Sequence, residues 1–209
     1  MTDLPALCGS IDIYLFDQLL RRRIRPDMRI FDAGCGDGRN VEFLLREGYD
    51  VYGVDADPRA IAAIGMSGNR FRCERLESMS FPDAFADVVL SSAVLHFASD
   101  DDQFREMLEG SWRVLRPGGI FFCRLASSIG IETLVRRLHG RQHALPDGSR
   151  RYLVDEDLLM HWTAALGAEL LDPIKTTVVQ NQRSMTTWVL QKCRRAECQV
   201  PSASAECEG

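Results

Sequence analysis

Short apolar runs alternate with amphipathic segments along the first 126 residues of the chain. The apolar runs, each as long as a buried parallel strand, lie at about 29–33, 50–54, 70–73, 86–91 and 120–125. Segments with helical spacing of apolar side chains lie at about 10–24, 39–47, 57–64 and 100–115. Strands that alternate with helices predict an α/β fold, a doubly wound, Rossmann-like and mostly parallel sheet.

The pattern changes after the fifth run. Residues 127–152 are locally basic and contain a Pro-Asp-Gly turn, so we expect a lid-like insertion, with a solvated loop as the alternative. A helix starting at Asp155 follows. Two extended segments, about 169–179 and 184–192, then predict a C-terminal antiparallel hairpin that completes a seven-stranded sheet.

These segments predict a single domain over residues 1–192, with a helical cap at 1–25. The polar tail, 193–209, has the composition of a disordered segment. The exposed edge of the terminal hairpin offers a pairing surface, so we expect a monomer or a homodimer.

Composition narrows the functional classes. The 209 residues are 45% hydrophobic and carry a formal net charge of −5, which gives no indication of a nucleic-acid or membrane partner. No apolar run is long enough to span a membrane, and residues 1–9 lack a signal-peptide pattern, so we expect a cytoplasmic protein. The seven cysteines form no C-x-x-C motif and are interpreted as free thiols. We expect no metal, although Cys193, Cys198 and Cys207 cluster near the end.

The most informative segment is Ile30 to Asn40, with the sequence Ile-Phe-Asp-Ala-Gly-Cys-Gly-Asp-Gly-Arg-Asn. It predicts a buried strand, a glycine turn and the start of a helix, whose free N–H groups point at the turn. A second strand ends at Asp55, where an acid commonly binds ribose hydroxyls. The segment therefore predicts a nucleoside site.

The glycine spacing distinguishes between cofactors. Dinucleotide-binding loops have the spacing G-x-G-x-x-G, whereas Gly34, Gly36 and Gly38 have the spacing G-x-G-x-G, preceded by Asp32. An acid there disfavours a pyrophosphate and favours an ammonium group. S-adenosylmethionine has an amino-acid end and no phosphate, so it is the favoured cofactor.

Two further segments support that choice. Residues 79–90, Met-Ser-Phe-Pro-Asp-Ala-Phe-Ala-Asp-Val-Val-Leu, and residues 115–119, Leu-Arg-Pro-Gly-Gly, resemble motifs of class I S-adenosylmethionine-dependent methyltransferases, of the methyltransferase type 11 kind. With the glycine loop and Asp55, the resemblance spans roughly residues 28–126. Gly38-Arg39-Asn40 and the Glu-Gly-Tyr-Asp-Val turn at 47–51 show a shorter resemblance to the tellurite-resistance and thiol-methylating branch.

The resemblance implies a set of cofactor contacts. The residues expected at the cofactor's amino-acid end and ribose are Asp32, Gly34, Cys35, Gly36, Gly38, Asn40 and Asp55, with Ala56 beside the base. Relatives often have an Asp-Ala pair at the adenine site, whereas this chain has Arg75-Leu76. Leu76 can still offer its N–H, and either Glu74 or Glu77 can accept from the adenine amine. Ser91, at the end of the fourth strand, is expected near the methyl group.

The acceptor side is less well marked. His96 is a candidate general base, with packing beside the cofactor or helix capping as the alternative. Arg124 interrupts an apolar run and either binds an anionic substrate or pairs with an acid. The candidate substrate residues are Tyr14, His96, Arg124, Arg150, Arg151 and Tyr152.

The resemblance and the site residues together predict methyl transfer from S-adenosyl-L-methionine by direct displacement, releasing S-adenosyl-L-homocysteine. The small chain predicts a small-molecule acceptor, anionic or a thiol. One alternative is a non-catalytic S-adenosylmethionine-binding sensor or partner subunit, which the missing adenine-site acid favours. A second alternative is an NAD-dependent oxidoreductase, which the glycine spacing disfavours.

Overall fold

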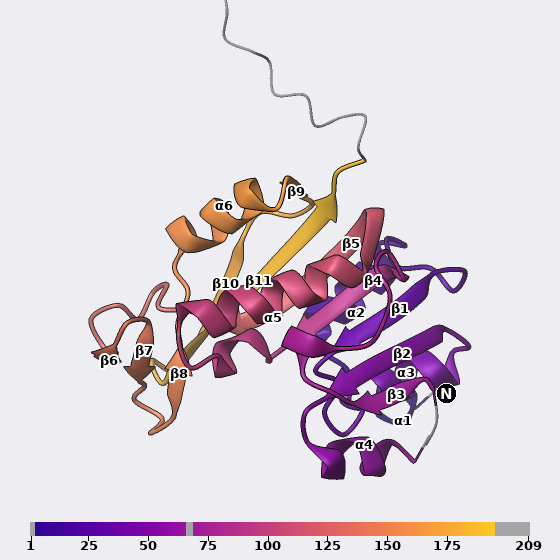
Figure 1. Cartoon of the computed structure of the whole chain (residues 1–209). Helices are drawn as coiled ribbons and strands as arrows, with labels where there is room; N and C mark the ends of the chain where they lie inside the picture. The colour runs from indigo at the N-terminus through magenta and orange to yellow at the C-terminus, as the bar shows by residue number, and fades with distance from the viewer. Residues whose placement is uncertain (1–2, 66–68, 195–209) are drawn as a thin grey trace, which may run out of the picture.

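The computed structural model of the chain describes residues 3–65 and 69–194 and is organised around one mixed sheet (Figure 1). The strands of this sheet are β1 (Arg29–Ala33), β2 (Asp50–Asp55), β3 (Phe71–Cys73), β4 (Ala86–Ser92), β5 (Leu115–Ala126), β9 (Ala168–Leu170), β10 (Lys175–Val179) and β11 (Arg183–Lys192). Their order is β10-β11-β5-β4-β1-β2-β3, with β9 paired to β11. Neighbouring strands from β5 to β3 are parallel, and β11 is antiparallel to β5. The predicted sheet with a terminal hairpin is therefore confirmed, with β9 as an additional strand.

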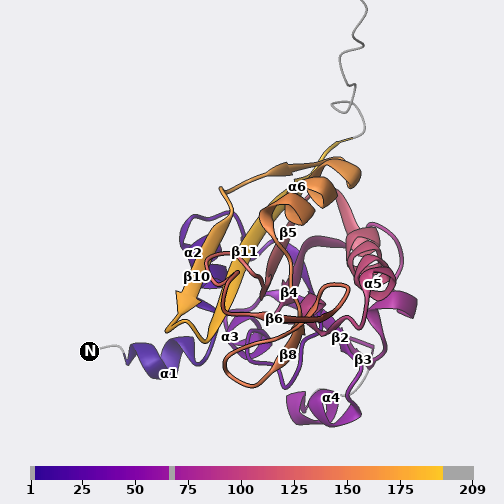
Figure 2. The ribbon, with the colours of Figure 1, turned by 90° about the vertical axis from the view of Figure 1, so that its left-hand side faces the viewer.

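Helices cover both faces of this sheet (Figures 1 and 2). The helices are α1 (Leu4–Cys8), α2 (Ile13–Leu20), α3 (Val41–Arg46), α4 (Pro58–Ile64), α5 (Asp101–Val114) and α6 (Glu156–Ala165), with 3-10 turns η1 (Leu76–Ser78) and η2 (Leu95–Phe97). Alternate strand residues face opposite sides: Ile30 packs in the cluster that includes α2 and α3 residues, and Phe31 in the cluster that includes α5 and α6 residues. Burial on both faces explains why these strands read as continuous apolar runs.

The N-terminal helix differs from the prediction. One helix was expected over 10–24, but α2 is shorter, because Asp12 caps its start by accepting a hydrogen bond from Tyr14 N and Arg21 ends it. The preceding helix, α1, was not predicted, and Gly9, at φ +59°, separates the two.

Two strand boundaries also differ. β5 begins at Leu115 rather than Ile120, and its pairing with β4 shifts register between Ala86 and Val88. The single extended segment predicted at 169–179 is divided into β9 and β10. Pro173 lies between them, and the carboxylate of Asp172 is held there by Arg21 and Arg23.

The basic segment 127–152 is neither a plain loop nor part of the main sheet. It contains a three-stranded antiparallel sheet, called here the lid sheet, made of β6 (Arg136–His139), β7 (Gln142–Ala144) and β8 (Arg150–Tyr152). Gly140 and Gly148 have positive φ angles at its two turns, where Asp147 Oδ1 accepts a hydrogen bond from Ser149 N. The lid sheet lies beside the main sheet at its lower left in Figure 1.

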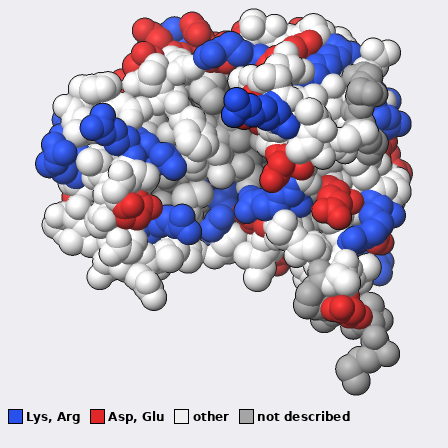
Figure 3. All heavy atoms as spheres, turned by 90° about the horizontal axis from the view of Figure 1, so that it is seen from below, with Lys and Arg blue, Asp and Glu red and all other residues white. Residues whose placement is uncertain are grey.

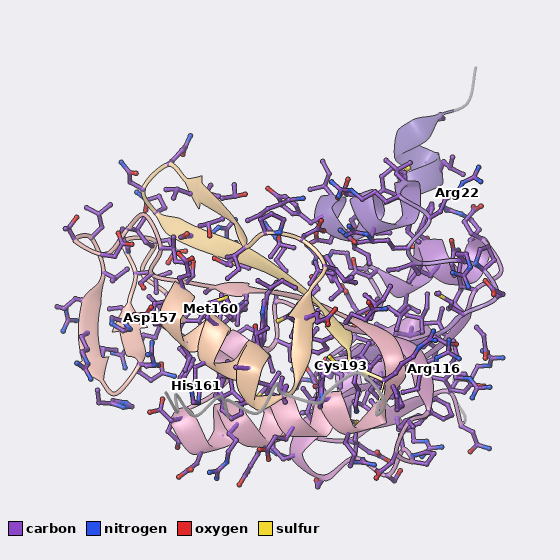
Figure 4. The ribbon with its side chains drawn as sticks, turned by 90° about the horizontal axis from the view of Figure 1, so that it is seen from above. Arg22, Arg116, Asp157, Met160, His161 and Cys193 are labelled. Carbon is purple, nitrogen blue, oxygen red and sulfur yellow. The ribbon has the colours of Figure 1, made fainter. Side chains whose placement is uncertain are left out.

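The strand order fixes where a ligand site is expected. From β1 the chain runs outward through β2 and β3, then returns to place β4 on the other side of β1. In open α/β sheets, ligands bind outside the carboxyl ends of the strands at such a switch point. Figure 4 views the molecule from above, the side away from the carboxyl ends of the parallel strands. It labels Asp157, Met160 and His161 of α6, and Cys193 after β11. No helix in the described residues is both long and apolar enough to cross a membrane.

Candidate functional site

A cavity of about 560 Å³, called here the cofactor cavity, opens at the switch point. Its walls come from the loop after β1, the ends of β2 and β4, the segment around η1, and α5. The lining residues are Gly34, Cys35, Gly36, Asp37, Arg39, Asn40, Val54, Asp55, Ala56, Glu74, Arg75, Leu76, Glu77, Ser92, Ala93, Val94, Phe97, Gln103 and Met107. Figure 3, a view from below, shows a hollow bordered by Lys and Arg side chains on this face of the molecule.

The glycine loop forms one wall of the cofactor cavity. Gly34 and Gly36 have φ angles of +93° and +55°, which other residues rarely adopt. A Cβ on Gly34 would collide with Val94, whereas a Cβ on Gly36 would meet no atom within 4 Å. Gly34 is therefore needed for close packing, and Gly36 leaves open space through which a ligand can approach the backbone.

Asp55 connects β2 to the glycine loop. Its Oδ2 accepts a hydrogen bond from Gly36 N, and its Oδ1 accepts one from Asp57 N, both at 2.9 Å. A carboxylate offers about four acceptor positions, so about two stay available on the side facing the cofactor cavity. The carboxylate is thus fixed in orientation by the backbone and still able to accept hydrogen bonds from a diol.

Asp32 lies behind the glycine loop with its carboxylate buried. The residue is 1% exposed, and neither carboxylate oxygen has a hydrogen-bond partner among the described residues. Burial raises the pKa of Asp32 from 3.8 to about 7, a shift that Arg39 opposes and Asp55 increases. Buried carboxylates without partners are rare, so this one fits a site that receives a cationic group.

The predicted adenine residues also line the cofactor cavity. Leu76 is buried, and Glu77 accepts hydrogen bonds from Gln103 and Arg75, both at 2.9 Å. Burial alone would raise the pKa of Glu77, but these hydrogen bonds and one from the backbone together keep it below its usual value. Glu74 also lines the cavity, and both of its oxygens are bound by Ser80. Glu77 therefore stays ionised, and Ala56 lies in the same wall.

The other predicted cofactor residues divide between wall and interior. Cys35 and Asn40 line the cavity, with Asn40 Oδ1 accepting from Asp12 N at 3.0 Å and burial raising the pKa of the Cys35 thiol. Gly38 lies on the outer side of the loop, against Ile64. Ser91 is fully buried, and its hydroxyl has no hydrogen-bond partner in the described part of the chain. Its neighbour Ser92 lines the cavity instead.

A second cavity of about 310 Å³, called here the acceptor cavity, adjoins the first and shares Arg39, Ala93 and Phe97 with it. Its remaining lining residues are His96, Arg124, Ala126, Leu145, Asp147, Ser149, Arg151, Val179, Arg183 and Met185. It lies between η2, the ends of β5 and β11, and the lid sheet. A group held at the shared wall would be in reach of both cavities.

His96 is placed at the acceptor cavity, but its chemistry differs from the prediction. Its Nδ1 accepts a hydrogen bond from Ala126 N at 3.0 Å, so the proton of the neutral ring resides on Nε2. Burial, with the nearby charges of Arg151 and Arg124, lowers the pKa of His96 to about 4. The only basic nitrogen is therefore occupied, and at neutral pH this ring is a hydrogen-bond donor rather than a general base.

Arg124 pairs with an acid that the sequence did not indicate. Its Nη1 lies 3.2 Å from Asp12 Oδ2, its guanidinium lies over the ring of Tyr14, and its Nε is buried without a partner among the described residues. Asp12, 2% exposed at the side chain, also lies 3.8 Å from Arg39 Nη2 and accepts a hydrogen bond from Ser92 Oγ. Asp12 thus joins the N-terminal cap to both cavities.

The remaining predicted substrate residues are only partly brought together. Arg151 lines the acceptor cavity, whereas the neighbouring Arg150 is exposed and lies outside it. Tyr152 is in the core, where its hydroxyl donates to Asp101 and its ring stacks on Phe104. Tyr14 lines neither cavity, and its hydroxyl contacts Thr177 of β10.

Several residues at the two cavities were not predicted from sequence. The most prominent are Arg39, Ser92, Phe97 and Arg183, which line the cavities, and Asp12, which lies behind their walls. Arg39 and Ser92 are next in sequence to the predicted residues Asn40 and Ser91, so the same motifs could have indicated them. Neither Phe97, which is 61% exposed, nor Arg183 belongs to a recognised motif. No pattern in the sequence around them therefore predicts that they line a cavity.

No group of three or more His, Cys, Asp or Glu residues that could hold a metal ion occurs within residues 3–65 and 69–194. Cys193 follows β11, while Cys198 and Cys207 lie outside the described residues, as does most of the predicted disordered tail.

Comparisons with known proteins show what the chain is similar to. Residues 31–123 match the family model described as a methyltransferase domain. An uncharacterised methyltransferase of Synechocystis is 33% identical over 100 residues, 47% of each chain. The tRNA 5-carboxymethoxyuridine methyltransferase of Escherichia coli is 27% identical over 124 residues, 55% of this chain and 46% of that one. A crystal structure of the Burkholderia thailandensis 1,6-didemethyltoxoflavin-N1-methyltransferase, with 1,6-didemethyltoxoflavin and S-adenosylhomocysteine bound, has a TM-score of 0.67 at 19% identity and covers 92% of this chain and 82% of that one.

The chain has the fold of solved S-adenosylmethionine-dependent methyltransferases, and the resemblance to their class I that was expected from the sequence is confirmed. The chain spans about half the length of the curated relatives that it matches. One of these relatives acts on tRNA by its name, so the expectation of no nucleic-acid partner stays a prediction.

Proposed function

We propose that this protein is an S-adenosylmethionine-dependent methyltransferase whose acceptor is a small molecule. The observation that carries the proposal is the pair of adjoining cavities: one has the glycine loop and Asp55, and the other meets it at Arg39, Ala93 and Phe97. The size of the acceptor cavity, about 310 Å³, suits a small ligand. The alternatives are a cofactor-binding sensor and an NAD-dependent oxidoreductase.

The residues of the cofactor cavity fit the cofactor. Asp55 suits the ribose diol and Glu77 suits the amine of adenine, while Asp32, which lies behind the glycine loop and does not line the cavity, supplies a carboxyl group without a partner that suits the ammonium group. When bound, S-adenosylmethionine supplies an activated methyl group on a sulfonium sulfur.

The chain's own contribution to the reaction is placement. The acceptor atom attacks the methyl carbon, the carbon–sulfur bond breaks with its electron pair left on sulfur, and the proton of a neutral acceptor is released to solvent. Phe97 and Ala93 form the shared wall at which these atoms would meet. In-line placement of this kind supplies much of the rate of such a displacement.

The first experiment measures binding of S-adenosylhomocysteine by titration calorimetry. Asp55→Ala removes two hydrogen bonds to a charged acceptor, so we expect an affinity about 100-fold weaker, from about 1.5 kcal/mol for each bond. Asp57→Ala is the matched control, because Asp57 caps α4 and does not line the cavity. Thermal unfolding of each variant verifies that it is folded.

The outcomes separate the candidate functions. Binding that Asp55→Ala loses and Asp57→Ala keeps supports the cofactor assignment, and transfer of a labelled methyl group to any small acceptor then supports catalysis. Binding without transfer to acceptors, water or the protein itself would favour the sensor. Failure to bind S-adenosylhomocysteine, combined with binding of NADH, would contradict the proposal.

A further inference from the structure

The walls of the acceptor cavity carry an excess of positive charge. Four arginines and one aspartate line it: Arg39, Arg124, Arg151, Arg183 and Asp147. A concentration of like charges is costly, since each arginine repels the others across a space partly screened from water. Only the charges that the protein's own acids leave unpaired can bind a ligand.

Two of the arginines are held by an internal acid. Asp12 lies 3.2 Å from Arg124 and 3.8 Å from Arg39, behind the wall of the cavity. The other two differ: neither Arg151 nor Arg183 has a carboxylate within 4.0 Å among the described residues. Arg151 Nη1 donates a hydrogen bond to the carbonyl oxygen of Arg150 at 2.7 Å, and its other N–H groups, like those of Arg183, are available to a ligand.

Among the described residues, Asp147 is the one acid that lines the same cavity and could offset the charges of Arg151 and Arg183. Its Oδ1 accepts hydrogen bonds from Ser149 N and Ser149 Oγ, and these, with weaker contributions from Arg183 and Arg151, lower its pKa. One carboxylate bound in a turn offsets only part of the charge of two arginines. Both arginines line the same cavity of about 310 Å³, which brings their charges within reach of one small ligand.

The rest of the cavity adds a donor and an apolar surface. His96 keeps its proton on Nε2, as its Nδ1 is bound by Ala126 N. Nε2 makes no hydrogen bond in the described part of the chain, so it is one more donor. Leu145, Met185 and Phe97 supply apolar wall, and Phe97 also carries the guanidinium of Arg151 at 4.8 Å from its ring centroid.

We propose that the acceptor is a small organic acid, whose carboxylate is bound by Arg151 and Arg183 and whose apolar body packs along Phe97 and Leu145. That the bound acid is a methyl acceptor rests on the proposed function, whereas the anion site is defined by its own residues. Arginine presents paired N–H donors in a plane that matches a carboxylate. The nucleophilic atom would then lie at the other end of the body, toward the wall shared with the cofactor cavity.

The test uses the full chain saturated with S-adenosylhomocysteine and three probes. Benzoate has a carboxylate and an apolar body, benzamide is its neutral counterpart, and inorganic phosphate is an anion without an apolar body. NMR titration of the probe signals gives the dissociation constants at 20 mM and 500 mM NaCl. We expect benzoate to bind most tightly of the three, and to weaken at high salt.

Three variants locate the site. Arg151→Gln and Arg183→Gln are each expected to weaken benzoate binding by about 3- to 10-fold, the range for partly exposed charge pairs. Arg150→Gln is the matched control, since Arg150 is the exposed neighbour of Arg151 on β8 and lies outside the cavity. The variants should leave S-adenosylhomocysteine affinity unchanged, because neither Arg151 nor Arg183 lines the cofactor cavity.

Each failure has its own signature. Benzamide binding as tightly as benzoate, or benzoate binding unaffected by both cavity variants, would overturn the proposal. Micromolar binding of a single-stranded RNA that Arg150→Gln weakens as much as Arg183→Gln would overturn it in favour of a nucleic-acid surface. Failure of the proposed function is seen separately, as loss of S-adenosylhomocysteine binding, and the benzoate titration is then run on the protein alone.

Discussion

Replacing Asp32 with asparagine should stabilise the ligand-free protein at pH 8 and weaken its binding of the cofactor. In the folded protein the pKa of Asp32 is raised from 3.8 to about 7, chiefly by burial, so the charged form is the costly one. Below about pH 4 the carboxyl is protonated in both the folded and the unfolded states, and it costs nothing. Between about pH 4 and pH 7 the unfolded state gives up this proton while the folded state keeps it, so stability is lost as the pH rises, and above pH 7 the carboxyl is ionised inside the fold as well and the loss is complete.

The size of the effect follows from the pKa shift. About three pKa units correspond to about 4 kcal/mol of free energy of unfolding, complete above pH 8. Between pH 5 and pH 8 the part that remains to be lost is about 2–3 kcal/mol. A buried asparagine amide without partners also costs about 1–3 kcal/mol, but that cost is the same at both pH values.

The assay is urea unfolding of Asp32→Asn and the unaltered protein at pH 5 and pH 8. The free energy of unfolding of the variant should gain about 2–3 kcal/mol on the unaltered protein between the two pH values. Calorimetry at pH 8 should show S-adenosylhomocysteine binding weakened by about 10-fold or more, because the ammonium group loses its counter-charge. If the difference between the two proteins is the same at both pH values, the buried charge is not the cost that we infer.

Three further predictions concern other parts of the site. His96→Gln keeps an acceptor for Ala126 N and an outward donor, so it should retain most methyl transfer. Because the pKa of His96 is about 4, the pH dependence of the rate should show no ionisation of this residue between pH 5 and 9. An ionisation near pH 6.5 that is lost in His96→Gln would instead identify His96 as a general base. Asp12→Ala leaves two arginines without their acid and removes a helix cap, so urea unfolding should show a loss of about 3 kcal/mol, and a loss below 1 kcal/mol would contradict the pairing. Glu77→Gln should weaken S-adenosylhomocysteine binding by about 10-fold and have little effect on an analogue whose adenine amine is replaced by oxygen; equal effects on both ligands would remove Glu77 from the adenine site.

The cofactor half of the molecule was predictable from sequence, because local rules govern it. Gly34 and Gly36 predict a turn with positive φ angles, and continuous apolar runs predict strands that are buried on both faces. Asp55 ends its strand in the same short unit, so its position relative to the loop follows from the fold. The strand boundary at Leu115 was missed, since an irregular pairing with β4 extends the strand through a glycine turn.

The acceptor half was much less predictable. Arg183 and Arg151 meet at one cavity only because β11 inserts antiparallel beside β5 and the lid sheet folds over that edge, and no local pattern specifies either contact. Tyr152 looked like a substrate residue by its neighbours, but alternation along β8 turns it into the core and leaves Arg151 facing the cavity. The tautomer of His96 depends on Ala126 N, thirty positions along the chain.

The two cavities draw on nearly separate stretches of the chain. Every residue lining the cofactor cavity lies between 34 and 107, while most of those lining the acceptor cavity lie between 124 and 185. On the proposed function, a crossover between related genes within β5 would exchange most of the acceptor cavity while leaving the cofactor half intact. Because the two sites follow one another along the chain, most of the residues that would select the acceptor lie in one contiguous part of the gene. Directed evolution toward new acceptors can therefore concentrate on that C-terminal part.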